Sequence, residues 1–371
     1  MAVPLASSPR MEQLHWSGPT GIVWSSMSSS FPTAAPLSTA RRVALTGASG
    51  YLGLALARRL REEGRQVTGL VRTGSAAAAC AELARLGVRL VRGDVTQRAT
   101  LAPLVDGAEL VIHSAAVIGY RRRLWGAMAA TNVLGTRHVV AACLAAGLPR
   151  LVHVSSIAAI GCTDSPRLLD DDADYAAGRL DAAYFDTKHE AELEVAAGIE
   201  AGLHAVIVNP GAIYGPSSVR SNSGQLVARI ASGRLSFAPV GGINVVPLET
   251  VVEGVLAAAV RGRRGARHVL GGENLHLHEL MARVRLAAGL PVRLHRFPTG
   301  AAPLLRAAME LVEPLVPDRV WFTPDLCAAF GRWMWFDTTR MRAELLVQPA
   351  DLDECLRATI AQLRRDGRLR G

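Results

Sequence analysis

Tyr184 and Lys188 are the residues whose types and spacing most clearly indicate chemistry. The 371-residue chain has 41 basic residues, and Lys188 is the only lysine among them. Arginine serves wherever a general positive charge is enough, so a retained lysine points to chemistry that a guanidinium cannot perform. Residues four apart share one face of a helix. An ammonium beside a phenol, whose ordinary pKa is about 10, favours the phenolate. The pair therefore predicts an acid–base site that moves a proton.

A glycine-rich turn, TGASGYLG at 46–53, follows a short apolar run and precedes an amphipathic stretch. Glycines let the main chain turn tightly and approach a pyrophosphate, and the N-terminus of a helix favours the anion. The order strand, turn and helix makes this GxxGxxG spacing much more specific than an isolated glycine triplet. We expect the turn to bind a dinucleotide through Thr46, Gly47, Ser49, Gly50, Tyr51, Leu52 and Gly53.

The ends of the next two expected strands bear on which dinucleotide is bound. NAD enzymes usually place an Asp or Glu after the second strand to hold the adenosine ribose. Here the strand ends Leu-Val-Arg-Thr, and Arg72 could pair with the 2′-phosphate of NADP as a planar fork. We predict NADP in preference to NAD, with stacking of Arg72 on adenine or exposure to solvent as the alternatives. Asp94 and Val95 are placed to bind the adenine edge, and a turn-stabilising Asp94 is an equal alternative.

Ser155 and Ser156 follow the expected strand 151–154. Ligands of doubly wound sheets bind at the carboxyl ends of the strands. A hydroxyl at this place could hydrogen-bond a substrate carbonyl together with the phenol of Tyr184. Without the Tyr–Lys pair, a serine that caps a loop would explain the same residues equally well.

Short apolar runs alternate with amphipathic stretches from Arg41 onward, and these elements position the residues above. Strands are expected at 43–46, 66–71, 89–91, 110–113, 151–154 and 205–208. Helices are expected at 52–63, 76–86, 125–146 and 184–201, and later at 226–232, 250–260, 277–287, 302–312 and 351–365. The alternation predicts an α/β fold, a doubly wound parallel sheet of the Rossmann type.

The alternation loosens after Tyr214. We therefore expect a Rossmann domain at 41–215 and a smaller substrate-binding lobe at 216–371, partly interleaved with it. Residues 1–40, rich in Ser, Pro and Ala, are expected to be a disordered extension. Met27 would make an equally good translational start, which N-terminal sequencing would test.

The composition is that of an ordinary enzyme, with half the residues hydrophobic and a fifth charged. No apolar run reaches the roughly 20 residues of a membrane span. The net charge of +9 is spread along the chain and does not indicate nucleic acid. Five cysteines without CxxC spacing argue for a reduced, cytoplasmic setting with no disulfide framework and no metal site.

These motifs together resemble the extended short-chain dehydrogenases/reductases, the NAD-dependent epimerase/dehydratase superfamily. The resemblance spans residues 41 to 365. It rests on the segments at 46–53, 93–95, 113–116, 132–136, 154–156, 184–188 and 209–216, in the family's order. Segments 155–161, 71–72 and 336–339 look most like 3β-hydroxysteroid dehydrogenase and dihydroflavonol-reductase members.

The resemblance implies roles for individual residues. Ser156, five residues before Gly161, would orient the carbonyl. Tyr184 would donate or accept the proton, and Lys188 would lower the tyrosine pKa and bind the nicotinamide ribose. Asn132 would help to hold the lysine through a water. Further cofactor contacts are implied for Ser114, Ala115, Ala116, Ser155, Pro210 and Gly211.

The leading interpretation is hydride transfer between NADP(H) and a ketone or secondary alcohol on a small apolar or polycyclic substrate. A nucleotide-sugar epimerase or dehydratase with tightly bound NAD is the alternative. Two features weigh against this alternative. No carboxylate follows the second strand to hold the ribose, and the stretch at 247–251 differs from the run that many family members carry in the second lobe. A non-catalytic NADP sensor would not need the Ser–Tyr–Lys set. The oligomeric state is left open, with a homodimer possible.

Overall fold

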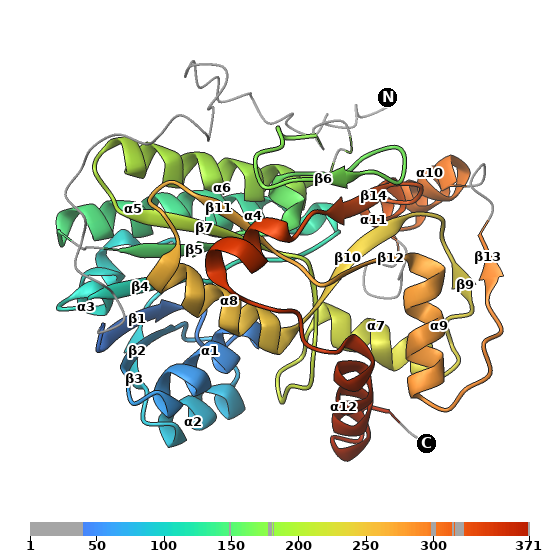
Figure 1. Cartoon of the computed structure of the whole chain (residues 1–371), viewed down its shortest axis with the longest axis horizontal. Helices are drawn as coiled ribbons and strands as arrows, with labels where there is room; N and C mark the ends of the chain where they lie inside the picture. Colours follow the sequence, from blue (N-terminus) through green and yellow to red (C-terminus); the bar gives the residue numbers. More distant parts are fainter. Residues whose placement is uncertain are drawn as a thin grey trace, which may run out of the picture.

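The computed structural model describes residues 40–147, 150–176, 180, 182–297, 302–313, 315 and 323–369. This part of the chain forms a large sheet covered by helices, with a smaller lobe beside it (Figure 1). The extension expected at 1–40 lies outside the described residues, apart from its last residue. No helix among the described residues is both long and apolar enough to cross a membrane.

Seven strands, paired in parallel throughout, make up the larger sheet of the described chain. Their order is β3 (Arg89–Arg92), β2 (Gln66–Val71), β1 (Arg42–Thr46), β4 (Leu110–His113), β5 (Leu151–Val154), β7 (Ala205–Pro210) and β11 (Arg267–Leu270). The strand order reverses between β1 and β4, and ligands of such sheets bind outside the carboxyl ends at this reversal. The Rossmann-type fold predicted from the sequence is confirmed.

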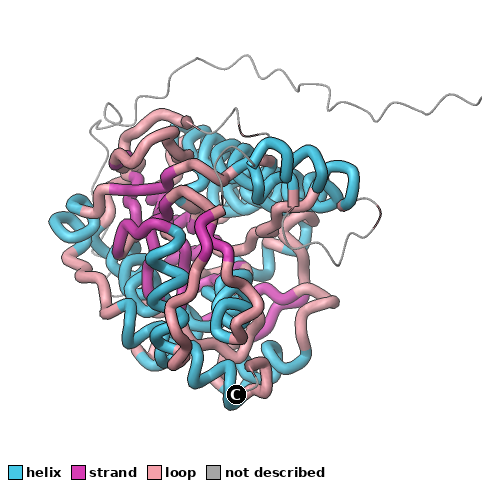
Figure 2. Tube along the Cα trace, turned by 90° about the vertical axis from the view of Figure 1, so that its right-hand side faces the viewer, coloured by secondary structure: helices cyan, strands magenta, loops and turns pink. Residues whose placement is uncertain are grey.

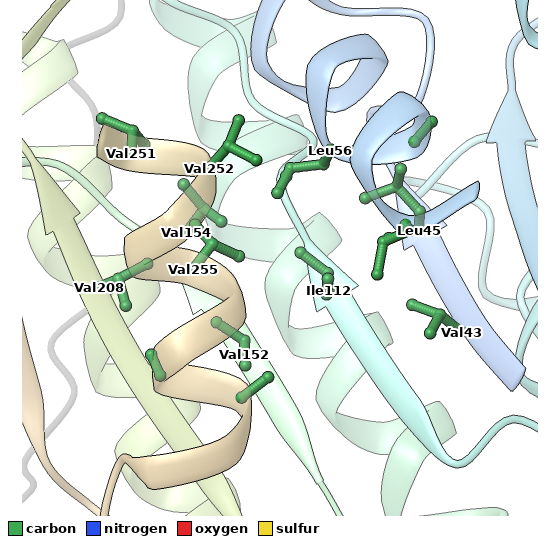
Figure 3. Packing of buried hydrophobic residues seen from close by; sticks show 14 of the residues in the cluster. Val43, Leu45, Leu56, Ile112, Val152, Val154, Val208, Val251, Val252 and Val255 are labelled. Carbon is green, nitrogen blue, oxygen red and sulfur yellow. The ribbon is translucent and has the colours of Figure 1, made fainter. Parts of the chain in front are cut away.

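Side chains of each strand alternate between the two faces of the sheet, and both faces are apolar. Val43 and Leu45 of β1 pack toward α1 (Tyr51–Glu62) and α8 (Leu248–Arg261). Figure 3 shows the valines of α8 and Leu56 of α1 meeting this face. Ala44 packs on the other face with residues of α5 (Gly135–Ala145) and α6 (Ala183–Glu200). Helices therefore enclose the strands, as the side view shows (Figure 2).

The remaining helices of the sheet domain are α2 (Ala77–Arg85), α3 (Ala102–Val105) and α4 (Trp125–Met128). The helix predicted over 125–146 is present, but its middle is not α-helical. A π-helical segment, Ala129–Leu134, separates α4 from α5. Gly135 follows it, where a Cβ would lie 2.7 Å from Cγ2 of Val95. Such π segments widen the helix and occur frequently at functional sites, and this one contains Asn132.

The smaller lobe is built on a second sheet in the described chain, β12 (Glu273–His276), β10 (Gly242–Pro247), β14 (Trp333–Phe336) and β6 (Leu168–Leu169), with β8 (Ala212–Tyr214) beside β10. α7 (Asn222–Ala231), α9 (Leu277–Ala287) and α12 (Leu352–Arg365) contribute to its core. α12 begins where Asp351 caps it by accepting from the main-chain N–H of Glu354 at 2.7 Å. α10 (Ala302–Val312), α11 (Pro324–Ala328) and the short pair β9 (Phe237–Ala238) and β13 (His295–Arg296) complete the lobe.

Gly53 is where the first helix approaches the glycine-rich turn most closely. A Cβ there would lie 2.0 Å from the carbonyl oxygen of Gly47, so the turn or the helix would have to move. We expect Gly53→Ala to destabilise the protein by about 2 kcal/mol or more, measured by calorimetry. Gly126→Ala is the control, because this position in α4 has open space around it. Equal melting temperatures for the two variants would contradict the argument.

Candidate active site

Tyr184 and Ser156 meet at the carboxyl end of β5. Tyr184 lies in the first turn of α6, is 8% exposed and has the side chain of Ser156 beside its phenol. The Ser156 hydroxyl also accepts from the main-chain N–H of Ala158 at 3.2 Å, which caps a short 3₁₀ turn, Ile157–Ala159. Burial raises the pKa of the Tyr184 phenol, and the hydrogen bond with Ser156 acts in the opposite direction. The structure thus brings together the phenol and the serine chosen from the sequence.

Lys188 lies one helical turn beyond Tyr184 and is only 2% exposed. Its Nζ donates to the main-chain oxygen of Val154 at 3.0 Å. Burial lowers the pKa of Lys188 to about 8, and the negative charge of Glu192 opposes this shift. The lysine is thus held at the end of β5, the strand that precedes Ser156. Its expected effect on the phenol pKa stays a prediction.

Asn132 is buried in the π segment and anchors the chain that follows β4. Its Oδ1 accepts from the main-chain N–H of Val117 at 2.8 Å, and its Nδ2 donates to the oxygen of the same residue at 3.0 Å. Nδ2 also contacts Oγ1 of Thr187, the residue before the lysine, at 3.2 Å. The amide therefore joins three segments of the site, and its contact with Lys188 through a water stays a prediction.

His113 is a site residue that our sequence analysis did not select. Its two ring nitrogens lie 2.7 Å from Oγ1 of Thr46 and 3.0 Å from Oγ1 of Thr136. Burial, and next the charge of Lys188, lower the pKa of His113 to about 3, so the ring is neutral. His113 therefore links the glycine-rich turn to the helix of Asn132. Its place at the end of a buried strand was the available signal.

The glycine-rich turn packs closely against the segment that follows β4. Gly47 has a φ of +69°, and a Cβ there would lie 2.8 Å from the main chain of Ser114 and Ala115. The hydroxyl of Ser114 donates to the oxygen of Thr46 at 2.8 Å, and the N–H of Ala115 donates to Oγ1 of Thr46 at 3.2 Å. The two segments expected to bind the cofactor are thus in direct contact, and the predicted residues Ser49, Gly50, Leu52 and Ala116 lie on them.

Arg72 lies near the same turn and is exposed. Its main-chain N–H donates to Oγ of Ser75 at 3.0 Å, and Ser49 donates to the same oxygen at 3.2 Å. Ser75 therefore ties the end of β2 to the glycine-rich turn. This bridge was not foreseen, because a serine in a short loop carries no sequence signal.

Asp94 takes the turn-stabilising role, one of the two alternatives considered for it. Its Oδ1 accepts from the N–H and the hydroxyl of Thr96, both at 2.9 Å, which is a turn-stabilising contact. Val95 is buried in the core between the sheet and its helices, and its main-chain oxygen lies 2.9 Å from Nδ1 of His138. Contacts of both residues with adenine stay predictions.

The carboxyl ends of β5 and β7 carry three further predicted residues, Ser155, Pro210 and Gly211. The side-chain oxygen of Ser155 is buried and has no hydrogen-bond partner among the described residues. Pro210 ends β7, and the N–H of Gly211 donates to the oxygen of Leu270 at 3.0 Å. Tyr51, in the first turn of α1, donates to the oxygen of Gly215 at 3.0 Å. An unpartnered hydroxyl and a glycine-lined turn fit a dinucleotide at this edge.

An apolar cluster surrounds Tyr184. Its buried members are Met128, Ala158, Cys162, Leu180, Ala182, Tyr184 and Phe185, and Tyr120, Trp125 and Met334 pack against them. The ring of Tyr120 lies 6.0 Å from that of Tyr184, edge to face. Trp125 donates to Oδ2 of Asp325 at 3.0 Å, so α11 adjoins this cluster. The ring of Tyr184 is therefore packed among apolar side chains.

The family follows from a comparison with known proteins. Residues 43–251 match the model of the NAD dependent epimerase/dehydratase family. The chain belongs to this family. It is an enzyme of the extended short-chain dehydrogenase/reductase type, as the motifs predicted.

Several relatives of this chain are named as reductases or dehydrogenases. A Synechocystis protein provisionally named dihydroflavonol 4-reductase is 32% identical over 68% of this chain and 74% of its own. A 2-alkyl-3-oxoalkanoate reductase from Stenotrophomonas maltophilia is 32% identical over 67% and 76%. A 3β-hydroxysteroid dehydrogenase/Δ5→4-isomerase from Mycobacterium tuberculosis is 28% identical over 74% and 66%. The chain is therefore an NAD(P)-dependent oxidoreductase of the family.

Solved structures agree on the fold. The protein designated gox2253 superposes with a TM-score of 0.78 at 30% identity, over 89% of this chain and 99% of its own. A nucleoside-diphosphate-sugar epimerase from Pseudomonas aeruginosa gives a TM-score of 0.72 at 24% identity, over 89% and 99%. The second likeness speaks for the fold alone.

Asn132 should contribute to stability through its contacts with Val117. Replacing it with alanine leaves a partly buried main-chain N–H and carbonyl without partners, so we expect Asn132→Ala to cost about 1 to 2 kcal/mol in chemical denaturation. Asn222→Ala, at an exposed position that begins α7, should change stability by no more than about 0.5 kcal/mol. A similar loss in both variants would show that the amide of Asn132 has no special structural role.

Proposed function

We propose that this enzyme interconverts a ketone and a secondary alcohol on a small apolar or polycyclic substrate, with NADP(H) as the cofactor. The observation that carries the proposal is the adjacency of the Ser156 hydroxyl and the Tyr184 phenol, with buried Lys188 one helical turn away and an apolar cluster around the ring. A proton donor in such surroundings suits a carbonyl that is attached to an apolar molecule better than a carbonyl on a charged nucleotide sugar.

The proton chemistry follows from the positions of three side chains. The hydroxyl of Ser156 can hold the carbonyl oxygen beside the phenol of Tyr184, which donates a proton to it during reduction. Lys188 supplies positive charge behind the phenol and favours the phenolate that remains. A nicotinamide cofactor supplies the hydride when it is bound. The apolar cluster keeps water away from the reacting carbonyl.

The preference for NADP rests on the charge at the end of β2. Arg72 is exposed there, and Ser49 and Ser75 lie beside its main chain with their hydroxyls. An arginine with two hydroxyls is a suitable set of donors for a phosphate dianion. The absence of a carboxylate at the sequence position after β2 also disfavours a ribose with a free 2′-hydroxyl.

The names of the relatives support the same chemistry. The Stenotrophomonas protein is named for reduction of an alkyl-substituted 3-oxo acid and the Mycobacterium protein for a hydroxysteroid. Both names denote ketone–alcohol chemistry on bodies with much apolar surface. The epimerase alternative has its support in fold likeness at lower identity.

The first experiment is to denature freshly purified protein and identify any released nucleotide, and then to assay NADPH oxidation with a panel of apolar ketones. An empty protein that reduces apolar ketones with NADPH would support the proposal. Tightly held NAD together with turnover of a nucleotide sugar would overturn it in favour of an epimerase.

Tyr184→Phe should lower the rate of ketone reduction about a hundredfold or more, because the proton donor is lost. The affinity for NADPH, measured by fluorescence titration, should change little. Tyr175→Phe is the matched control, since it removes a phenol that bonds Asp186 outside the proposed proton path. Unchanged turnover in Tyr184→Phe would exclude the phenol as the proton donor.

Arg72→Ala should weaken NADPH binding about tenfold, the loss expected for one charge-assisted contact with a phosphate. The affinity for NADH should stay near its wild-type value, because NADH has no 2′-phosphate. Arg85→Ala, at an exposed position of α2, provides the control for a general loss of positive charge. An equal loss of affinity for both nucleotides would contradict the assignment.

A further inference from the structure

Glu192 is the most deeply buried carboxylate near the candidate site. It lies one helical turn beyond Lys188 on α6 and has no exposed surface. Its Oε1 accepts from Nδ2 of Asn209 at 2.6 Å, and the same Nδ2 donates to the main-chain oxygen of Ser156 at 2.9 Å. One amide group thus connects the carboxylate to the serine that holds the phenol.

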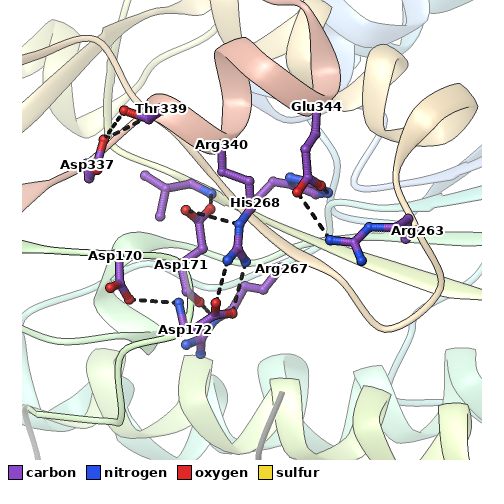
Figure 4. Close-up of polar contacts among 11 residues, drawn as sticks. Asp170, Asp171, Asp172, Arg263, Arg267, His268, Asp337, Thr339, Arg340 and Glu344 are labelled. Atoms are coloured by element: carbon purple, nitrogen blue, oxygen red, sulfur yellow. Dashed lines mark hydrogen bonds and ion pairs between the residues drawn. The ribbon is translucent and has the colours of Figure 1, made fainter. Parts of the chain in front are cut away.

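The other oxygen of Glu192 is held from the next strand of the sheet. Arg267 of β11, 2% exposed, approaches Oε2 through Nη1 at 3.3 Å. Its Nε donates to the main-chain oxygen of Asp171 at 2.5 Å, and its Nη2 donates to that of Ala173 at 2.7 Å. Figure 4 shows Arg267 among Asp171, Asp172 and Arg340. The guanidinium is fixed on several sides, so it holds the carboxylate in one position.

Titratable groups face Lys188 from two other elements, β4 and β5, as well as from α6. His113 of β4 and His153 of β5 face the lysine, and burial lowers the pKa of both rings, which are therefore neutral. On α6, burial raises the pKa of Tyr184, so its phenol adds no charge beside the lysine.

Around Glu192, Arg267 of β11 carries positive charge. His189 of α6 also faces the carboxylate, and burial lowers the pKa of that ring. Among the described groups that act on Lys188, Glu192 is thus the one that favours its ammonium form.

We propose that Glu192 is a positioning residue for the catalytic set: through Asn209 it fixes the main chain of Ser156, and through its charge it sustains the ammonium of Lys188. This inference rests on the proposed function of the Ser–Tyr–Lys set. The two effects can be separated, because one depends on a hydrogen bond and the other on charge.

The charge effect can be measured without cofactor or substrate. Lys188 is the only lysine of the chain, so protein labelled with ¹³C at the lysine ε-carbon and produced without a lysine-containing tag gives one ε-resonance to follow against pH. Glu192→Gln keeps an oxygen for Asn209 but removes the charge. We expect the lysine midpoint to fall by about one pH unit or more. Glu192→Asp, which retains the charge, should titrate close to the wild type.

Glu194→Gln is the matched control. Glu194 lies on the same helix, pairs with Arg137 at 2.6 Å and is partly exposed, so its loss should leave the lysine midpoint unchanged. An unchanged midpoint in Glu192→Gln, with the protein folded by circular dichroism, would overturn the charge effect. If ketone reduction is absent from the wild type, the proposed function fails, and the lysine titration still decides the role of Glu192.

The hydrogen-bond effect is tested with Asn209→Ala, which removes the contact with Ser156 and leaves the carboxylate. We expect kcat for ketone reduction to fall about tenfold, as for one lost positioning hydrogen bond, with KM nearly unchanged. The lysine midpoint should stay near the wild-type value. Glu192→Gln should behave differently: because its lysine loses the proton at lower pH, the alkaline limb of the pH–kcat profile should move to lower pH. Wild-type kcat in Asn209→Ala would overturn the positioning of Ser156.

Discussion

Lys188 and Glu192 lie one turn apart on α6 with almost no exposure to solvent. Two charges taken out of water are costly unless the protein surrounds them with partners of good geometry. These partners come from three neighbouring strands: the carbonyl of Val154 at the end of β5, the amide of Asn209 on β7 and the guanidinium of Arg267 on β11. The order β5, β7 and β11 at one side of the sheet is therefore what permits a buried lysine in the site. Without β11, the carboxylate would lose its arginine.

The same requirement explains how the later part of the chain is joined to the sheet. Arg267 belongs to the chain that follows β10, yet β11 returns to the large sheet and pairs with β7. Its guanidinium binds main-chain oxygens of the loop at 171–173. Asp171 of this loop accepts from the N–H of Val269 at 2.6 Å, and Asp172 pairs with Arg340 (Figure 4). A network that begins at the candidate site thus ends near the surface, and it holds the loop and the C-terminal segment against the sheet.

The sequence predicted what depends on local pattern. Tyr184 and Lys188 share a helix, and the glycine-rich turn lies between one strand and one helix, so spacing alone predicts their geometry. The prediction did not extend to contacts over longer separations. Glu192 and Arg267 are 75 residues apart, and nothing in either local sequence indicates the other. The π segment was also missed, because the residues at 125–146 have ordinary helical composition. The π segment widens the helix at Asn132, whose bonds to Val117 and Thr187 exist only in the folded chain.

The surroundings of Tyr184 differ in kind from the groups that carry the proposed chemistry. Proton transfer needs particular atoms at hydrogen-bond distance, so the proposed reaction requires the side-chain types of Ser156, Tyr184 and Lys188. An apolar cluster needs only volume and a lack of charge, which many combinations of side chains provide. Its members come from distant segments, as the contact of Trp125 with Asp325 across 200 residues illustrates. Members of this family can therefore share hydride chemistry on one fold and differ in substrate, in keeping with relatives named for an oxoalkanoate and a hydroxysteroid. If the proposed reaction holds, substrate choice in this enzyme is encoded where the sequence pattern is weakest.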